Sequence, residues 1–149
     1  MSQITNAEDW IRYRAGFAPN SEAIHDLASD RHFSYAAFDR RIDRAAAYLQ
    51  QTLGVGRGMR VAILAMNGSD VFEIQFACQR IGAIFLPINW RLAVPEIEYI
   101  CRDAAPQVII SGEEFIAPAT EVAERLGIAN LVSIANGAPS TYETGLANA

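Results

Sequence analysis

The segment with the clearest potential for ligand chemistry is Pro87-Ile88-Asn89-Trp90-Arg91-Leu92. Arg91 offers a planar fork of five N–H donors that matches a phosphate group, and Trp90 offers an aromatic face for stacking. The segment begins at the end of an apolar run, Ile84–Ile88, and open α/β sheets bind ligands at the carboxyl ends of their strands. The alternative is a loop whose Trp fills a gap in the core and whose Arg is solvated. The residues alone favour neither reading.

Two other stretches resemble nucleotide-binding elements only superficially. Gly54-x-Gly56-x-Gly58 follows a predicted helix and precedes a predicted strand, whereas the dinucleotide fingerprint GxGxxG follows a strand and opens a helix. We therefore interpret these glycines as a helix end and a turn. Asn67-Gly68-Ser69 lies between a predicted strand and a helix N-terminus, where an anion could bind. No lysine follows it, so capping of the helix by Ser69 is the preferred interpretation.

Two histidines, His25 and His32, lie near a predicted hairpin, with Asp26 and Asp30 close by. Two histidines without convergent spacing do not predict a metal site, and neither H-x-x-x-H nor C-x-x-C occurs. We interpret these residues as part of a surface loop. The sequence predicts no metal ligand and no catalytic residue.

The composition excludes several classes of function. All twelve basic residues are Arg, so the chain supplies no Schiff-base lysine and no phosphate-loop lysine. A net charge of −5 argues against nucleic-acid binding, which usually shows a basic face. Cys78 and Cys101 fall inside helical patterns and are expected in the core. The N-terminus has no apolar signal core and no run is long enough for a transmembrane segment, so we expect a cytoplasmic protein.

The chain of 149 residues has the size of one domain. Near the N-terminus we expect a helix from Asn6 to Phe17, capped by Asn6, and a small hairpin from Ala23–Leu27 and His32-Phe33. Ser34 is expected to cap the next helix. On that helix the apolar residues follow the 3.6-residue period, and Arg41 is among the charged residues predicted to face water.

Strands and helices alternate from residue 34 onward. The expected strands are Val61–Met66, Ile84–Ile88, Val108–Ser111 and Leu131–Ile134; the expected helices between them are Asp70–Ile81, one beginning at Pro95, and Pro118–Leu126. This alternation predicts an α/β fold with a doubly wound, mostly parallel sheet and helices on both faces. Residues 1–134 form the predicted α/β unit. Residues 135–149 are small, polar and weakly patterned, which predicts a linker or tail.

An ordered set of short motifs resembles the opening of the AMP-forming acyl-CoA synthetases, members of the adenylate-forming ligase superfamily. The motifs are Phe33-Ser34-Tyr35, the run Leu53 to Ile63, Asn67-Gly68-Ser69, Arg80-Ile81-Gly82-Ala83 and Pro87 to Leu92. The resemblance covers roughly residues 22–134. No single motif is diagnostic, but their order is specific, and it implies that the chain is the first subdomain of a larger ligase.

The resemblance implies the chemistry of the full-length protein. Members of this family activate a carboxylic acid with ATP, release pyrophosphate and pass the acyl group to coenzyme A. ATP, Mg²⁺ and coenzyme A are therefore the implied cofactors, and a carboxylic acid is the implied substrate. The family's phosphate loop and catalytic lysine are absent from these 149 residues, so the isolated chain is expected to be inactive. The alternative is a stand-alone, non-catalytic α/β module that binds a ligand or partner.

Only one residue receives a role from the resemblance. In some members, the Arg of this loop contacts the nucleotide phosphates of CoA, which implies a CoA contact for Arg91. The large apolar helices are expected to face either a second copy, in a homodimer, or the remainder of a longer chain.

Overall fold

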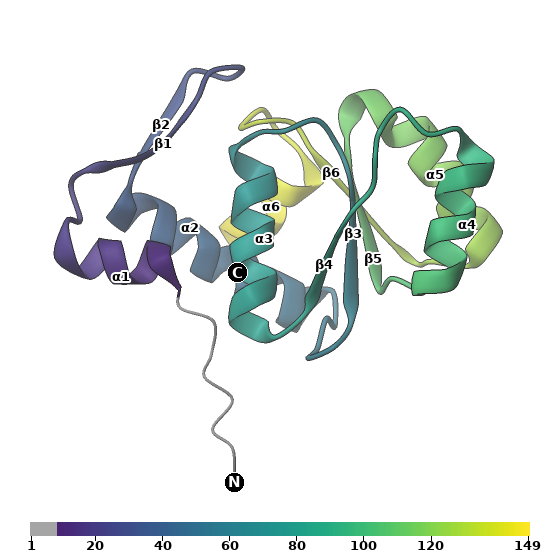
Figure 1. Ribbon diagram of the computed structural model, residues 1–149, viewed down its shortest axis with the longest axis horizontal. Helices are drawn as coiled ribbons and strands as arrows, with labels where there is room; N and C mark the ends of the chain where they lie inside the picture. Colours follow the sequence, from purple (N-terminus) through teal and green to yellow (C-terminus); the bar gives the residue numbers. More distant parts are fainter. Residues whose placement is uncertain (1–8) are drawn as a thin grey trace, which may run out of the picture.

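A four-stranded parallel sheet lies at the centre of the computed structural model, which describes residues 9–149 (Figure 1). Its strands run in the order β4-β3-β5-β6. Their bounds are β3 (Arg60–Leu64), β4 (Ile84–Pro87), β5 (Val108–Gly112) and β6 (Asn130–Ile134). Val61 on β3 pairs with Phe85 on one side and Val108 on the other. The predicted doubly wound, parallel α/β architecture is confirmed.

Helices cover both faces of the sheet because successive side chains of each strand point to opposite sides. Val61 and Ile63 belong to one apolar cluster, and Ala62 and Leu64 belong to the other. The first cluster packs beneath α2 (Tyr35–Ala47), α3 (Ser69–Ile81) and α6 (Thr141–Asn148), and the second beneath α4 (Val94–Ala104) and α5 (Ile116–Leu126). Cys78 lies in the first cluster and Cys101 in the second, as expected.

The N-terminal elements lie beside this three-layer unit (Figure 1). They are α1 (Trp10–Phe17) and the antiparallel hairpin of β1 (Glu22–Asp26) and β2 (Arg31–Ser34). The proposed cap Asn6 lies outside the described residues; in the structure Asp9 caps α1 by accepting a hydrogen bond from the Arg12 N–H at 3.0 Å. The aromatic stripe of α1 is not buried, since Trp10 is 60% exposed and Phe17 74%.

The turns that lead into β3 explain the glycine-rich stretch. Ser34 caps α2 through the Ala37 N–H, as predicted, and α2 continues into a short π-helical turn, η1 (Tyr48–Thr52). Gly54 and Gly58 follow with φ of +67° and +77°, a region that residues with a Cβ rarely adopt. They act as turn residues. They lie before the amino end of β3, whereas the glycines of a dinucleotide-binding motif follow the carboxyl end of a strand.

The structure corrects the prediction for the C-terminal stretch. Thr141–Asn148 forms the helix α6, which Ser140 caps by accepting a hydrogen bond from the Glu143 N–H at 3.2 Å. Tyr142 and Leu146 are buried in the first apolar cluster. The prediction of a linker or tail was wrong for this segment because two apolar side chains four residues apart anchor a helix whose other residues are small or polar.

Candidate functional site

The loop between β4 and α4 is held as a tight turn at the carboxyl end of the sheet. Ile88 is buried and fixes the start of the loop. The Asn89 side-chain oxygen accepts a hydrogen bond from the Arg91 N–H at 3.0 Å, and the Asn89 carbonyl accepts one from the Leu92 N–H at 3.1 Å. These bonds set the direction in which the Trp90 and Arg91 side chains leave the backbone.

Trp90 supports Arg91. The guanidinium carbon of Arg91 lies 4.1 Å from the centre of the Trp90 ring, a cation–π distance. The Trp90 ring also stacks on Phe115, with centroids 5.5 Å apart. Phe115 ends the short helix η2 (Glu113–Phe115), which follows β5. Because β4 and β5 flank β3, this contact spans the carboxyl end of the central strand.

The arrangement combines the two readings of this loop. Trp90 is half-buried and packs into the second apolar cluster, as a gap-filling residue would. Arg91 is exposed, and no carboxylate pairs with its guanidinium among residues 9–149. The ring therefore positions a cation whose N–H donors remain available to an anionic ligand.

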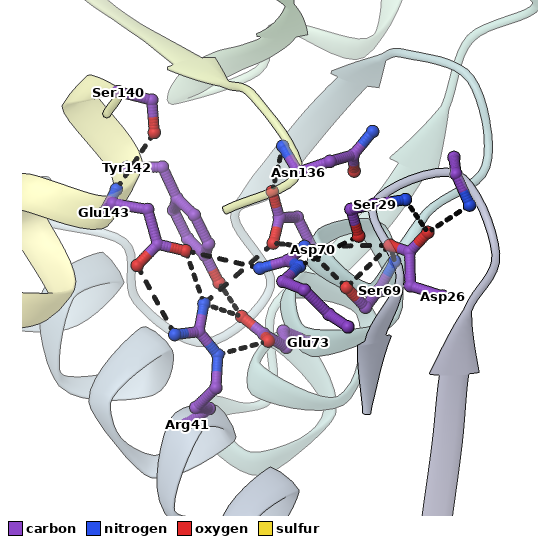
Figure 2. A network of polar contacts seen from close by, with 12 residues as sticks. Asp26, Ser29, Arg41, Ser69, Asp70, Glu73, Asn136, Ser140, Tyr142 and Glu143 are labelled. Atoms are coloured by element: carbon purple, nitrogen blue, oxygen red, sulfur yellow. Dashed lines mark hydrogen bonds and ion pairs between the residues drawn. The ribbon is translucent and has the colours of Figure 1, made fainter. Parts of the chain in front are cut away.

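A second group of polar residues forms a buried network near the N-terminus of α3 (Figure 2). Ser69 donates to the Asp26 carboxylate from its backbone N–H at 2.8 Å and from its hydroxyl at 2.9 Å. The prediction that Ser69 caps α3 was wrong, since Gly68 is the cap residue and makes no side-chain cap bond. Asp26 thus occupies the position at this helix end where an external anion would bind.

The ionisation of Asp26 reflects this setting. Burial opposes the charged form, but hydrogen bonds from Ser69 and Ser29 outweigh it and lower the pKa of Asp26 from 3.8 to about 2. Its other carboxylate oxygen accepts from the backbone N–H groups of Ala28 and Ser29, at 3.1 and 3.3 Å. Both oxygens are therefore matched to donors.

Arg31 extends the network from the hairpin to the N-terminus of α3. Its Nη2 donates to the Ser69 hydroxyl at 2.6 Å and to Asp70 Oδ1 at 2.7 Å. Asp70 is fully buried, and its second oxygen accepts from the Asn136 N–H at 3.0 Å. The hairpin, α3 and the segment after β6 are joined by one chain of hydrogen bonds.

Arg41 forms the other half of the network. It was predicted to face water, but it donates to Glu73 from Nε at 2.5 Å and from Nη2 at 3.1 Å. The same Nη2 donates to Glu143 at 2.6 Å, and the Tyr142 hydroxyl donates to Glu73 at 3.1 Å. Burial raises the pKa of the Glu73 carboxyl, while hydrogen bonds to the two carboxylates outweigh burial and raise the pKa of Arg41.

We call this buried polar network the clasp. Its members are Asp26, Arg31, Arg41, Ser69, Asp70, Glu73, Asn136, Tyr142 and Glu143. Every buried polar side-chain atom among the described residues has a hydrogen-bond partner, so the clasp offers no unengaged base or nucleophile. The sequence pattern did not indicate this network because its partners are far apart along the chain. Arg41 is 32 residues from Glu73 and 102 residues from Glu143. The available signal was Glu73, a charged residue within the apolar run of α3.

Arg80 gathers a third set of carboxylates. It is mostly buried and donates to Asp9 at 2.7 Å, to Asp39 at 2.5 Å and to Asp43 at 2.8 Å. Asp39 and Asp43 lie on α2, and Asp9 caps α1. Their pairing with Arg80 ties α1 and α2 to α3.

The two histidines come together in a way that their spacing along the chain did not indicate. His25 on β1 lies directly opposite His32 on β2 in the strand register. Their rings stack with centroids 3.7 Å apart. The usual metal-ligand spacings apply to residues on one helix or in one short loop, so they do not indicate a pair of histidines that meets across a hairpin.

Comparison with known proteins assigns the family. The profile of the AMP-binding enzyme family matches residues 11–146. The chain belongs to this family. It is 35% identical over 125 residues to an indoleacetate–CoA ligase of Aromatoleum aromaticum, a match that covers 84% of this chain and 24% of the relative. It is 33% identical over 102 residues to the long-chain-fatty-acid–CoA ligase FadD13 of Mycobacterium tuberculosis, covering 68% and 20%.

Solved structures agree with this assignment. A fatty acyl CoA synthetase of Mycobacterium tuberculosis superposes with a TM-score of 0.79 at 27% identity, covering 93% of this chain and 27% of that one. The chain thus spans about a quarter of the length of these relatives, and it is a fragment of an acyl-CoA ligase family member.

None of the helices between residues 9 and 149 has the length and apolar character needed to span a bilayer.

Proposed function

We propose that this chain is the N-terminal part of an ATP-dependent, AMP-forming carboxylic acid–CoA ligase. The family match over residues 11–146 carries the proposal, and relatives named as CoA ligases support it. The whole protein would convert an acid and ATP to an acyl-adenylate and pyrophosphate, and then form a thioester with coenzyme A. The relatives are named as CoA ligases or synthetases, so they lend no support to a stand-alone binding module.

The residues present fit only part of the cofactor set. The 149 residues contain no lysine and no Ser/Thr/Gly-rich phosphate loop, so we assign the ATP and Mg²⁺ contacts to other parts of the full-length protein. Coenzyme A brings nucleotide phosphates, and an exposed Arg at the carboxyl end of the sheet suits them. This chain's share of the function is therefore substrate binding rather than bond formation.

Arg91 is the residue we propose for the CoA contact. It is exposed, it rests on Trp90 at 4.1 Å, and no described carboxylate competes for it. Because the ring holds the side chain, less conformational freedom is lost when a phosphate binds. A screened contact at a rim is worth roughly 1 kcal/mol or a little more.

The test uses the full-length enzyme. Arg91→Gln should raise KM for CoA by about 5- to 10-fold, because 1.4 kcal/mol corresponds to a factor of ten. Pyrophosphate release in the absence of CoA should stay unchanged. With pantetheine, which lacks the nucleotide, the variant and the wild type should perform alike. Arg102→Gln, an exposed arginine of α4 that pairs with Glu98, is the matched control.

Two results would contradict the proposal. A loss of pyrophosphate release in Arg91→Gln would assign the side chain to the adenylation step, and an equal loss with pantetheine would remove the phosphate contact. The proposed division of labour between this chain and the rest of the protein has a separate test. Purified residues 1–149 should release no pyrophosphate from ATP with any acid, and release by this fragment would overturn the division of labour described above.

A further inference from the structure

The hairpin of β1 and β2 places three side chains with metal-ligating atoms at one end of the molecule. His25 and His32 face each other across the strand pair. Asp30, in the connecting turn, adopts φ of +52°, a left-handed conformation that Asp tolerates better than most residues. This turn directs the carboxylate back toward the two rings, so that its Oδ1 lies 3.0 Å from His25 Nε2 and 3.6 Å from His32 Nε2.

These separations suit a single metal ion. All three ligand atoms lie within 4.8 Å of one another. Two ligands about 2.1 Å from a tetrahedral zinc ion are about 3.4 Å apart, which is close to both carboxylate–imidazole distances. The two imidazole rings are stacked, with 21° between their planes, so the exposed side chains must rotate for both ring nitrogens to point at one ion.

Glu22 orients one of the ligands from behind. The Nδ1 of His32 lies 2.7 Å from the Glu22 carboxylate. This contact favours the ring N–H on Nδ1 and leaves Nε2, which lies 3.6 Å from Asp30 Oδ1, as the nitrogen that can bind a metal. A carboxylate that holds the outer nitrogen of a ligating histidine is the usual support of zinc–histidine sites.

We propose that His25, Asp30 and His32 form a binding site for a first-row transition ion of the zinc type. Two imidazoles and one carboxylate favour Zn²⁺ or Co²⁺ over Mg²⁺ and Ca²⁺, which prefer all-oxygen ligands. Three protein ligands leave a fourth tetrahedral position for water or for a group from a partner. The site is separate from the Arg91 loop, and it does not depend on the ligase function.

The site is tested by titrating the 149-residue chain with CoCl₂, followed by visible absorption, and with ZnCl₂, followed by calorimetry. We expect one ion per chain, with the intense visible bands of tetrahedral cobalt. His25→Gln, His32→Gln and Asp30→Asn should each abolish these bands. Glu22→Gln should keep them but weaken binding about 10- to 100-fold, as loss of a supporting carboxylate does. Glu121→Gln, an exposed carboxylate on α5, should bind like the wild type.

The outcomes separate clearly. Circular dichroism checks that each variant is folded, and the conservative change Glu22→Gln provides a graded readout that a general loss of structure would not mimic. Wild-type chain without saturable cobalt binding would overturn the proposal. Binding that survives in the His25→Gln, His32→Gln double variant, or that shows a thiolate-to-cobalt band from the cysteines, would overturn it as well.

Discussion

Replacement of Asp26 by Asn tests whether the clasp stabilises the fold through a buried charge. Asp26 accepts from Ser69 on one carboxylate oxygen and from Ala28 and Ser29 on the other. An Asn side chain must point its NH₂ group at one of these donor sets, whichever way the amide is turned. The substitution is nearly isosteric, so it changes charge and hydrogen bonding without opening a cavity.

The expected loss follows from the ionisation of Asp26. Its pKa falls from 3.8 to about 2 in the fold, and one pKa unit corresponds to about 1.36 kcal/mol, so ionised Asp26 contributes roughly 2 kcal/mol at neutral pH. An unmatched buried donor adds to this cost. We expect Asp26→Asn to lower the free energy of unfolding by about 2–4 kcal/mol at pH 7.

The assay is urea unfolding of the 149-residue chain, followed by far-ultraviolet circular dichroism. The folded-state pKa lies below the unfolded value, so the stabilisation is complete above pH 3.8 and is lost as the pH falls toward 2. The difference between wild type and variant should therefore shrink across this window. Asp103→Asn, an exposed aspartate of α4, is the control and should change stability by less than about 0.5 kcal/mol. A loss below about 1 kcal/mol at pH 7, or a loss of the same size at pH 7 and pH 2, would refute the reasoning.

Two further predictions concern packing and thiol chemistry. A Cβ on Gly145 of α6 would overlap the ring of Tyr48, so Gly145→Ala should cost about 1–3 kcal/mol in urea unfolding. Gly16→Ala in α1 meets no atom within 4 Å and should instead add up to about 1 kcal/mol; the opposite order would contradict the packing of α6. Burial raises the pKa of Cys78 to about 12 and also raises the pKa of Cys101, so a thiol reagent at pH 8 should label neither residue in the native chain and both in urea. Fast labelling of the native chain would show that these helices open.

The sequence contained most of the information about the sheet because its strands and helices are defined by local periodicity. The strand Val108–Ser111 was predicted within one residue of the observed β5, and the helix that ends before Gly127 was also found. Each of these elements buries an apolar face whose spacing is visible along the chain. The prediction failed where a short element depends on few apolar residues, as in α6.

The polar contacts could not be predicted in the same way. Arg41 and Glu143 are 102 residues apart, and no local pattern distinguishes a buried Arg from a solvated one. The stacked pair of His25 and His32 depends on the register of the hairpin, which is set by the turn rather than by the spacing of histidines. The loop that carries Arg91 could be located from the sequence at the end of β4, and its role in CoA binding stays a prediction. The stacking of Trp90 on Phe115 depends on the parallel order of β4, β3 and β5, which no local pattern shows.

The clasp also bears on how such a chain folds during synthesis. A ribosome that has released residues 1–134 has provided every strand of the sheet, and Arg41 can already meet Glu73. Their remaining partners, Tyr142 and Glu143, are still to come. Until they arrive, a buried carboxylate lacks one of its donors, and the nascent sheet carries an uncovered apolar face. Folding of the unit therefore cannot finish until this last short helix, whose Glu143 lies 102 residues after Arg41, has been made.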